Sequence, residues 1–371
     1  MERVYLDNAS TTPIDPAVLD TMWPYMKEHF GNPSSIHTHG RAIKAAIEKS
    51  RKTVAEILGT SPSEIFFTSG GTEADNMAIC GTVVQYQIRT IITSKLEHHA
   101  VLHCVSHQAH AHGVEVLFVN HDEKGTLDLA HLDALLASCH SPALVSLMHG
   151  NNEIGNLNPI QQIGEICEAH GAIFHSDTVQ PVHFIVGAAH KFHGPKGVGF
   201  LYIRHDKKIP AYIQGGAQER NMRGGTENVY GIIGLAKALE IADTHYSLHK
   251  NQISELKSYL IAGLKDNVPD IRFNGNCLDL ENSLYTVVSA SMPVSEWNEM
   301  LLENLDINKI SASGGSACSS GSSVGSHVIK ALNPDNGRAP LRISLSKFNT
   351  KADVDRLLKV LSGMYQPLQS V

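Results

Sequence analysis

The sequence lacks several features that mark common classes of protein. It has 30 basic against 37 acidic residues and a formal net charge of −7, whereas proteins that bind nucleic acid directly usually carry a basic surface. No apolar run is long enough to cross a membrane. The opening residues, MERVYLDNASTTP, contain no apolar core of a signal peptide. We therefore expect a cytoplasmic protein that binds neither membranes nor, directly, nucleic acid.

The sequence also has few cysteines and no CxxC pair. Five of its six cysteines lie in apolar or helical contexts, where buried reduced thiols are expected; these are Cys80, Cys104, Cys139, Cys167 and Cys277. The sixth, Cys318, lies in ISASGGSACSSGSSVGSH (310–327), a run built almost wholly of serine, glycine and alanine. Such a segment has little side-chain packing to hold it still, so the role of its thiol needs an explanation.

Short β-branched runs alternate with amphipathic stretches, a pattern typical of a mostly parallel sheet with helices on both faces. A chain of 371 residues usually forms more than one core. We expect an α/β protein with a large domain over residues 15–237. Residues 1–14 and 238–371 would form a smaller α+β domain that carries the Cys318 loop. The expected strands of the large domain are 64–69, 90–94, 115–120, 143–149, 172–177, 183–188 and 199–203.

Ligands of such sheets bind beyond the carboxyl ends of the strands. In FFTSGGTEADNMAI, a strand leads through Gly70 and Gly71 into a helix, whose free N–H groups could bind a phosphate. A plain strand-to-helix turn is the alternative. Thr72 followed by Asp75 resembles a capping box.

Two further strand ends carry side chains that could react with or bind a ligand. Asp177 ends the strand AIFHSD and could pair with a protonated ring nitrogen, although a loop-capping aspartate is the commoner role. Lys191 follows the next strand and precedes GPKG, where partial desolvation can make a lysine an imine-forming nucleophile. A surface lysine is the alternative. A phosphate cradle, a carboxylate and such a lysine together are the parts that bind pyridoxal 5'-phosphate.

With these motifs the sequence resembles the cysteine desulfurases of the class V aminotransferase family of pyridoxal-phosphate enzymes, along nearly its whole length. The resemblance implies fold type I of these enzymes. It rests on the following motifs, in this order: YLDNASTTP, HFGNPSS, FTSGGTEADN, EHHAVL, NNEIG, AHKFHGPKG, RGGTEN, GGSACSSGS and LRISLSK.

The resemblance also implies roles for single residues. Lys191 would hold the cofactor through an imine, Asp177 would pair with the pyridine nitrogen, and His98 would stack on the ring and move protons. Other cofactor contacts would come from Asn152 and Gln180 at the ring oxygen, from Gly71, Thr72 and His190 at the phosphate, and from Thr226 of the second subunit of a homodimer.

On the substrate side, the resemblance implies that Arg342, aided by Asn152, binds the carboxylate of L-cysteine. Cys318 would take the substrate's sulfur as a persulfide, and alanine would leave. A thiol on a mobile loop could then carry the sulfur to an acceptor protein, for iron–sulfur cluster assembly or thiolation. A selenocysteine lyase, another class V enzyme and a catalytically silent scaffold are the alternatives.

The chain departs from the family pattern in two places. Ala188 stands where the family commonly has a hydroxyl residue that contacts the phosphate. The stretch from Asp177 to Lys191 is shorter than in the family, and parallel neighbouring strands need a crossover of roughly a dozen residues. We therefore hypothesise that a segment is missing from the sequence between Gln180 and Pro181.

A stripe of histidines, His99, His103 and His107, recurs at four-residue steps in HHAVLHCVSHQAHAH. This spacing could bind zinc, but no HExxH motif accompanies it. A solvated or dimer-facing stripe is the preferred interpretation, and no metal site is expected.

Overall fold

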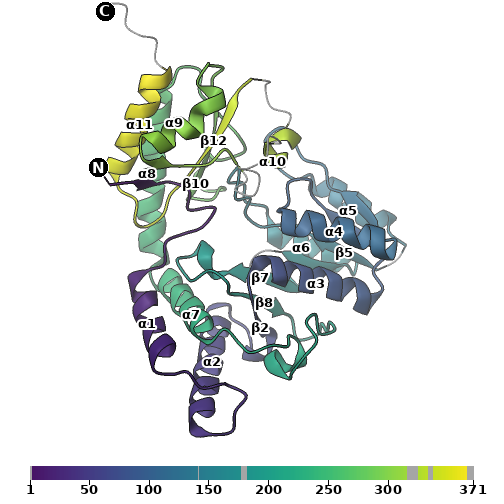
Figure 1. Cartoon of the computed structure of the whole chain (residues 1–371). Coiled ribbons are helices and arrows are strands. Elements are labelled where there is room, and N and C mark those ends of the chain that lie inside the picture. The colour runs from purple at the N-terminus through teal and green to yellow at the C-terminus, as the bar shows by residue number, and fades with distance from the viewer. Residues whose placement is uncertain (1, 141, 177–181, 316–324, 333–336, 366–371) are drawn as a thin grey trace, which may run out of the picture.

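The computed structural model describes residues 2–140, 142–176, 182–315, 325–332 and 337–365. A large sheet with helices on both faces fills one part of the molecule, and a smaller helical and β region lies above it in Figure 1. In the described ranges, no helix is both long and apolar enough to cross a membrane.

The large sheet confirms all seven strands that the sequence predicts. Its order is β2-β8-β7-β6-β5-β3-β4. The strands from β7 to β4 are parallel, and β8 runs against β7 and β2. The bounds are β2 Ile65–Thr68, β3 Thr90–Thr93, β4 Glu115–Phe118, β5 Ala143–Ser146, β6 Ile173–Ser176, β7 Phe184–Ala188 and β8 Gly199–Ile203.

Alternation along the strands places an apolar core on each face of the sheet. Phe67 packs with one set of helices, whereas its neighbour Phe66 packs with the other, because successive side chains point to opposite faces. The first set is α2 (Thr38–Ile57), α5 (Leu129–Ser138), α6 (Ile160–Ala169) and α7 (Val229–Thr244); the second is α3 (Gly71–Tyr86) and α4 (His99–His112). α1 (Pro16–Lys27) packs on α7.

The smaller region has a separate apolar core. Its antiparallel sheet has the order β12-β10-β9 (Ala339–Ser344, Val287–Met292, Arg272–Phe273) and packs with α8 (Tyr246–Asn267), α9 (Leu301–Ile307) and α11 (Lys351–Tyr365), as Figure 1 shows. Val4 and Leu6 join this core, and β1 (Val4–Tyr5) pairs with β11 (Ile310–Ser311).

The domain boundaries given above stay a prediction. The remaining short elements are α10 (His327–Ala331) and the 3-10 helices η1 (Pro62–Glu64), η2 (Ala189–Lys191), η3 (Gln218–Asn221) and η4 (Asn298–Met300).

The connection from β6 to β7 is short for its topology. The two strands are parallel neighbours, with His175 opposite Phe184 and Ser176 opposite Ile185, and only residues 177–183 join them. A parallel pair usually needs a crossover of about a dozen residues or more. The strand assignment behind the missing-segment hypothesis is therefore confirmed. The hypothesis itself stays a prediction, since residues 180 and 181 lie outside the described ranges.

Candidate active site

Several candidate residues lie at one edge of the large sheet. β2, β3, β5, β6 and β7 run in the same direction, so their carboxyl ends meet at this edge. Gly71 opens α3 after β2, and His98 precedes α4 after β3. Asn152 follows β5, and Lys191 ends η2 after β7. The strand order thus gathers segments that are far apart in the sequence.

The N-terminus of α3 offers backbone donors at this edge. Its N-cap is Gly70, which supplies no side-chain hydrogen bond, so the first N–H groups remain open to an anion. The expected capping box is wrong, because Thr72 lies inside the helix and Asp75 is buried in it. Instead, Glu73 accepts a hydrogen bond from the Ser69 N–H at 2.9 Å.

Lys191 lies against the N-terminal arm. Its Nζ donates to the backbone oxygens of Ala9 at 2.6 Å and Ser10 at 3.0 Å. Beside it, Nδ1 of His190 lies 3.2 Å from the Thr11 hydroxyl. Burial and then the charge of Lys191 lower the pKa of His190 to about 4. His190 is therefore neutral at pH 7 and can act as a hydrogen-bond partner rather than as a cation.

His98 is the N-cap of α4. Its Nδ1 accepts the Ala100 N–H at 3.1 Å, which leaves the ring proton on Nε2. His98 is exposed over part of its surface, and partial burial is the main cause that lowers its pKa. The nearby Lys191 charge lowers the pKa further, against an opposing effect of Asp75. A neutral imidazole held by the helix can stack on a planar ligand and exchange a proton at Nε2.

Arg342 lies fully buried in β12, with 1% of its side chain exposed. Nη2 forms an ion pair with Asp7 at 2.8 Å, and Nη1 donates to the backbone oxygen of Asn152 at 3.0 Å. Nε has no partner among the described residues. A substrate carboxylate that bound Arg342 would therefore replace Asp7, or reach the Nε atom, which is buried in this structure.

Sequence reasoning gave two acidic residues near these groups no role in the site. Asp7 belongs to the motif YLDNASTTP, which gave no role for its carboxylate. Asp75 lies buried in α3, with Oδ1 3.4 Å from Nε2 of His175, and Nδ1 of His175 lies 2.9 Å from the Ser146 hydroxyl. The sequence did offer one signal for Asp75, because an acidic residue on a mostly apolar helical face is rarely buried without a partner.

Three candidate residues, Asp177, Gln180 and Cys318, lie outside the described ranges. Thr226 is exposed on the segment that follows Arg223. Arg223 forms an ion pair with Glu73 at 2.9 Å, which ties this segment to the first turn of α3. The proposed contact of Thr226 with a second subunit stays a prediction.

The histidine stripe is mostly solvated, since His103 and His107 are exposed. His99 instead packs against His327 of α10, with 4.3 Å between the ring centroids. Across the described ranges, no group of three or more histidine, cysteine, aspartate or glutamate side chains is placed to hold a metal ion.

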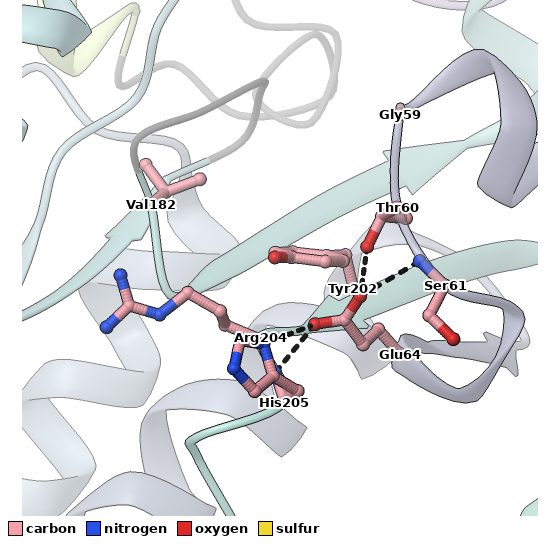
Figure 2. Close-up of a pocket in the computed structure, with 8 residues that line it drawn as sticks. All are labelled: Gly59, Thr60, Ser61, Glu64, Val182, Tyr202, Arg204 and His205. Atoms are coloured by element: carbon pink, nitrogen blue, oxygen red, sulfur yellow. Dashed lines mark hydrogen bonds and ion pairs between the residues drawn. The ribbon is translucent and has the colours of Figure 1, made fainter.

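A cavity of about 420 Å³, whose lining residues Figure 2 shows, lies beside the start of β2 and β7 and the end of β8. None of the candidate residues lines it. Glu64, its buried carboxylate, accepts hydrogen bonds from the backbone N–H groups of Ser61 at 3.0 Å and His205 at 2.7 Å, and from the Thr60 hydroxyl. These bonds occupy the carboxylate, so the cavity is not the candidate active site.

Known proteins resemble this chain over its whole length. The sequence model described as "Aminotransferase class-V" matches residues 4–357. "Cysteine desulfurase IscS" of Dictyoglomus turgidum is 41% identical, with 100% of this chain and 96% of the relative covered. "Putative cysteine desulfurase IscS 1" of Bacillus subtilis is 38% identical, with 99% and 100% covered. The first alignment spans 385 positions against 371 residues here, so that relative has residues without a counterpart in this chain.

Solved structures agree with this resemblance. A "NIFS-LIKE PROTEIN" superposes with a TM-score of 0.89 at 36% identity, covering 97% of this chain and 98% of its own. A NifS-like protein from Rickettsia africae superposes with a TM-score of 0.86 at 29% identity, covering 99% and 100%. The expected fold, a sheet of mostly parallel strands between helices with a smaller α+β region, is confirmed. The chain belongs to the class-V aminotransferase family.

Proposed function

We propose that this protein is a pyridoxal-phosphate-dependent cysteine desulfurase, which converts L-cysteine to L-alanine and stores the sulfur as a persulfide on Cys318. One observation carries the proposal: Lys191, His98 and the open N-terminus of α3 lie at one edge of the sheet. Relatives at about 40% identity that bear the name cysteine desulfurase support it.

The described residues fit the cofactor. The N-terminus of α3 has no side-chain cap and suits a phosphate, with Thr72 and the neutral His190 as further donors. Asn152 and Gln180 would bind the ring oxygen, and Asp177 the pyridine nitrogen. When bound, pyridoxal phosphate supplies an electron sink for the α-carbon of an amino acid. Lys191 would hold it covalently, and Thr226 of a second subunit would complete the phosphate site in a homodimer.

The remaining residues would orient the substrate and move protons. Arg342, with Asn152, would bind the carboxylate of L-cysteine, and His98 would stack on the ring and exchange a proton at Nε2. The Cys318 thiolate would then attack the substrate sulfur. The sulfur–sulfur bond forms as the bond from sulfur to Cβ breaks, and a proton on Cβ completes alanine. No external oxidant is needed.

The persulfide implies an acceptor protein, in cluster assembly or in thiolation, and we propose a cytoplasmic location. A selenocysteine lyase on the same site is the alternative, because elimination of selenium would need the same lysine and arginine.

The test compares the wild type with Cys318→Ala and with Cys139→Ala as the matched control cysteine. Each is incubated with pyridoxal phosphate, L-cysteine and a thiol reductant, and alanine and sulfide are quantified. We expect equal amounts of both products from the wild type and the control, and neither from Cys318→Ala. Normal sulfide release by Cys318→Ala would refute the role of that thiol. Alanine formed only from selenocysteine would establish the lyase instead.

A further inference from the structure

Two cysteines outside the candidate active site lie in direct contact. Cys80 of α3 and Cys104 of α4 place their Sγ atoms 3.5 Å apart, across the interface at which these two helices pack (Figure 1). The two residues are 24 positions apart in the sequence. Of the five cysteines that the structure describes, only these two form a thiol–thiol contact.

The surroundings of the two sulfurs are unequal. Cys80 is half-buried, whereas Cys104 is buried with 4% of its surface exposed. The Cys80 Sγ also accepts a hydrogen bond from Nε2 of Gln108 at 3.2 Å. The hydrogen bond from Cys104 lowers the pKa of Cys80, and the same contact raises the pKa of Cys104. Cys80 therefore has the greater thiolate character and the better access to solvent, as an attacking thiol requires.

We propose that Cys80 and Cys104 are a reversible redox modification site, which hydrogen peroxide oxidises to a disulfide between α3 and α4. The Cys80 thiolate attacks one peroxide oxygen, the oxygen–oxygen bond breaks, and one water leaves while Cys80 becomes a sulfenic acid. The Cys104 sulfur then attacks Cys80, the sulfur–oxygen bond breaks, and a second water leaves. The two thiols lose two electrons to the peroxide, and a dithiol reductant restores them.

The geometry requires little movement. A disulfide bond is about 2.05 Å long, so the two sulfurs would approach by roughly 1.5 Å from their 3.5 Å separation. The other described cysteines offer no such partner: Cys139 donates to the backbone oxygen of Leu135, and Cys167 and Cys277 are fully buried.

The bond would join the two helices that begin at the candidate cofactor site. α3 starts at Gly71 and α4 starts directly after His98. Oxidation would thus lock the relative position of a phosphate-binding segment and of a ring-stacking residue. The modification itself does not depend on the proposed desulfurase activity, because neither thiol takes part in it.

The test uses full-length protein with Cys318→Ser, so that the candidate nucleophile does not react. The protein is treated with a small excess of hydrogen peroxide, remaining thiols are alkylated after denaturation, and peptides are analysed by mass spectrometry. We expect two thiols fewer per chain, a cross-linked peptide pair that contains Cys80 and Cys104, and full recovery with dithiothreitol. Adding Cys139→Ser, the matched control of similar exposure, should leave this result unchanged.

Single variants test the order of the steps. With Cys104→Ser, Cys80 should stop at a sulfenic acid that dimedone traps; with Cys80→Ser, Cys104 should stay reduced. Circular dichroism checks that each variant is folded. The proposal is overturned if Cys80 proceeds to sulfinic acid without cross-linking in the parent protein, if it couples to a different cysteine, or if both thiols stay reduced.

Discussion

The buried ion pair between Arg51 and Glu219 allows a sharp test of how this fold is held together. Arg51 of α2 donates from Nη1 and Nη2 to the Glu219 carboxylate at 2.7 and 2.9 Å. The Phe67 N–H of β2 donates to the same carboxylate at 2.8 Å. Both side chains are about 3% exposed or less. Glu219 therefore connects a helix, a strand and η3.

Replacing Glu219 with alanine would leave the buried Arg51 guanidinium without its buried counter-charge, and only the half-exposed Glu48 would remain beside it. Breaking such a pair usually costs about 3–5 kcal/mol of the free energy of unfolding. The backbone does not change this expectation: Glu219 has a φ of 43°, and glutamate and alanine are equally strained there. Glu48 provides the matched control, since it contacts Nε of the same Arg51 at 3.2 Å but is 48% exposed. Glu48→Ala should cost at most about 1 kcal/mol.

The assay is urea unfolding followed by circular dichroism, with the same cofactor loading for each variant. The reasoning would be refuted if Glu219→Ala lowered the free energy of unfolding by no more than Glu48→Ala does. The double variant Arg51→Met with Glu219→Leu separates the effect of an unpaired buried charge on stability from the effect of lost side-chain volume. Because it removes both charges together, it should recover most of the stability that Glu219→Ala loses.

Three further predictions concern other positions. Burial lowers the pKa of Lys257 from 10.5 to about 8. Between pH 8 and 10.5, Lys257 therefore stays protonated in the unfolded chain but has lost its proton in the folded chain. The free energy of unfolding should therefore rise by about 3 kcal/mol between pH 8 and 10.5. Urea unfolding at several pH values would contradict this if the free energy of unfolding depended on pH in Lys257→Met as it does in the wild type. A Cβ on Gly187 would meet the Phe200 ring at 2.3 Å, so Gly187→Ala should cost about 1–3 kcal/mol. The control Gly363→Ala, with nothing within 4 Å, should gain about 0.5–1 kcal/mol in thermal unfolding. Ala188→Ser should tighten pyridoxal-phosphate binding about 3- to 10-fold by adding a hydroxyl donor to the phosphate; an unchanged dissociation constant in a fluorescence titration would show that the hydroxyl does not reach it.

Local pattern was enough to predict the secondary structure that positions the site. The seven strands of the large sheet were predicted because each is a short apolar, β-branched run. The start of α3 was misjudged in detail. A capping box was expected at Thr72, but the strand continues into a turn at Gly70, and the helix begins there without a side-chain cap.

The expectation that five cysteines are simply buried thiols was correct only in part. Cys104, Cys167 and Cys277 are buried, whereas Cys80 and Cys139 are half-buried. Burial of a residue on an amphipathic helix depends on which neighbouring helix covers it. Periodicity alone does not contain that information.

The sequence by itself determined the class of fold, the strand ends that carry reactive groups, and the family. These properties depend on residue types at short, fixed spacings. Only the tertiary structure decided that Asp7 pairs with Arg342, that Glu219 pairs with Arg51, and that Cys80 meets Cys104. Such contacts join residues that are distant in the chain, and they arise because packed elements exclude water and force buried polar groups to find partners.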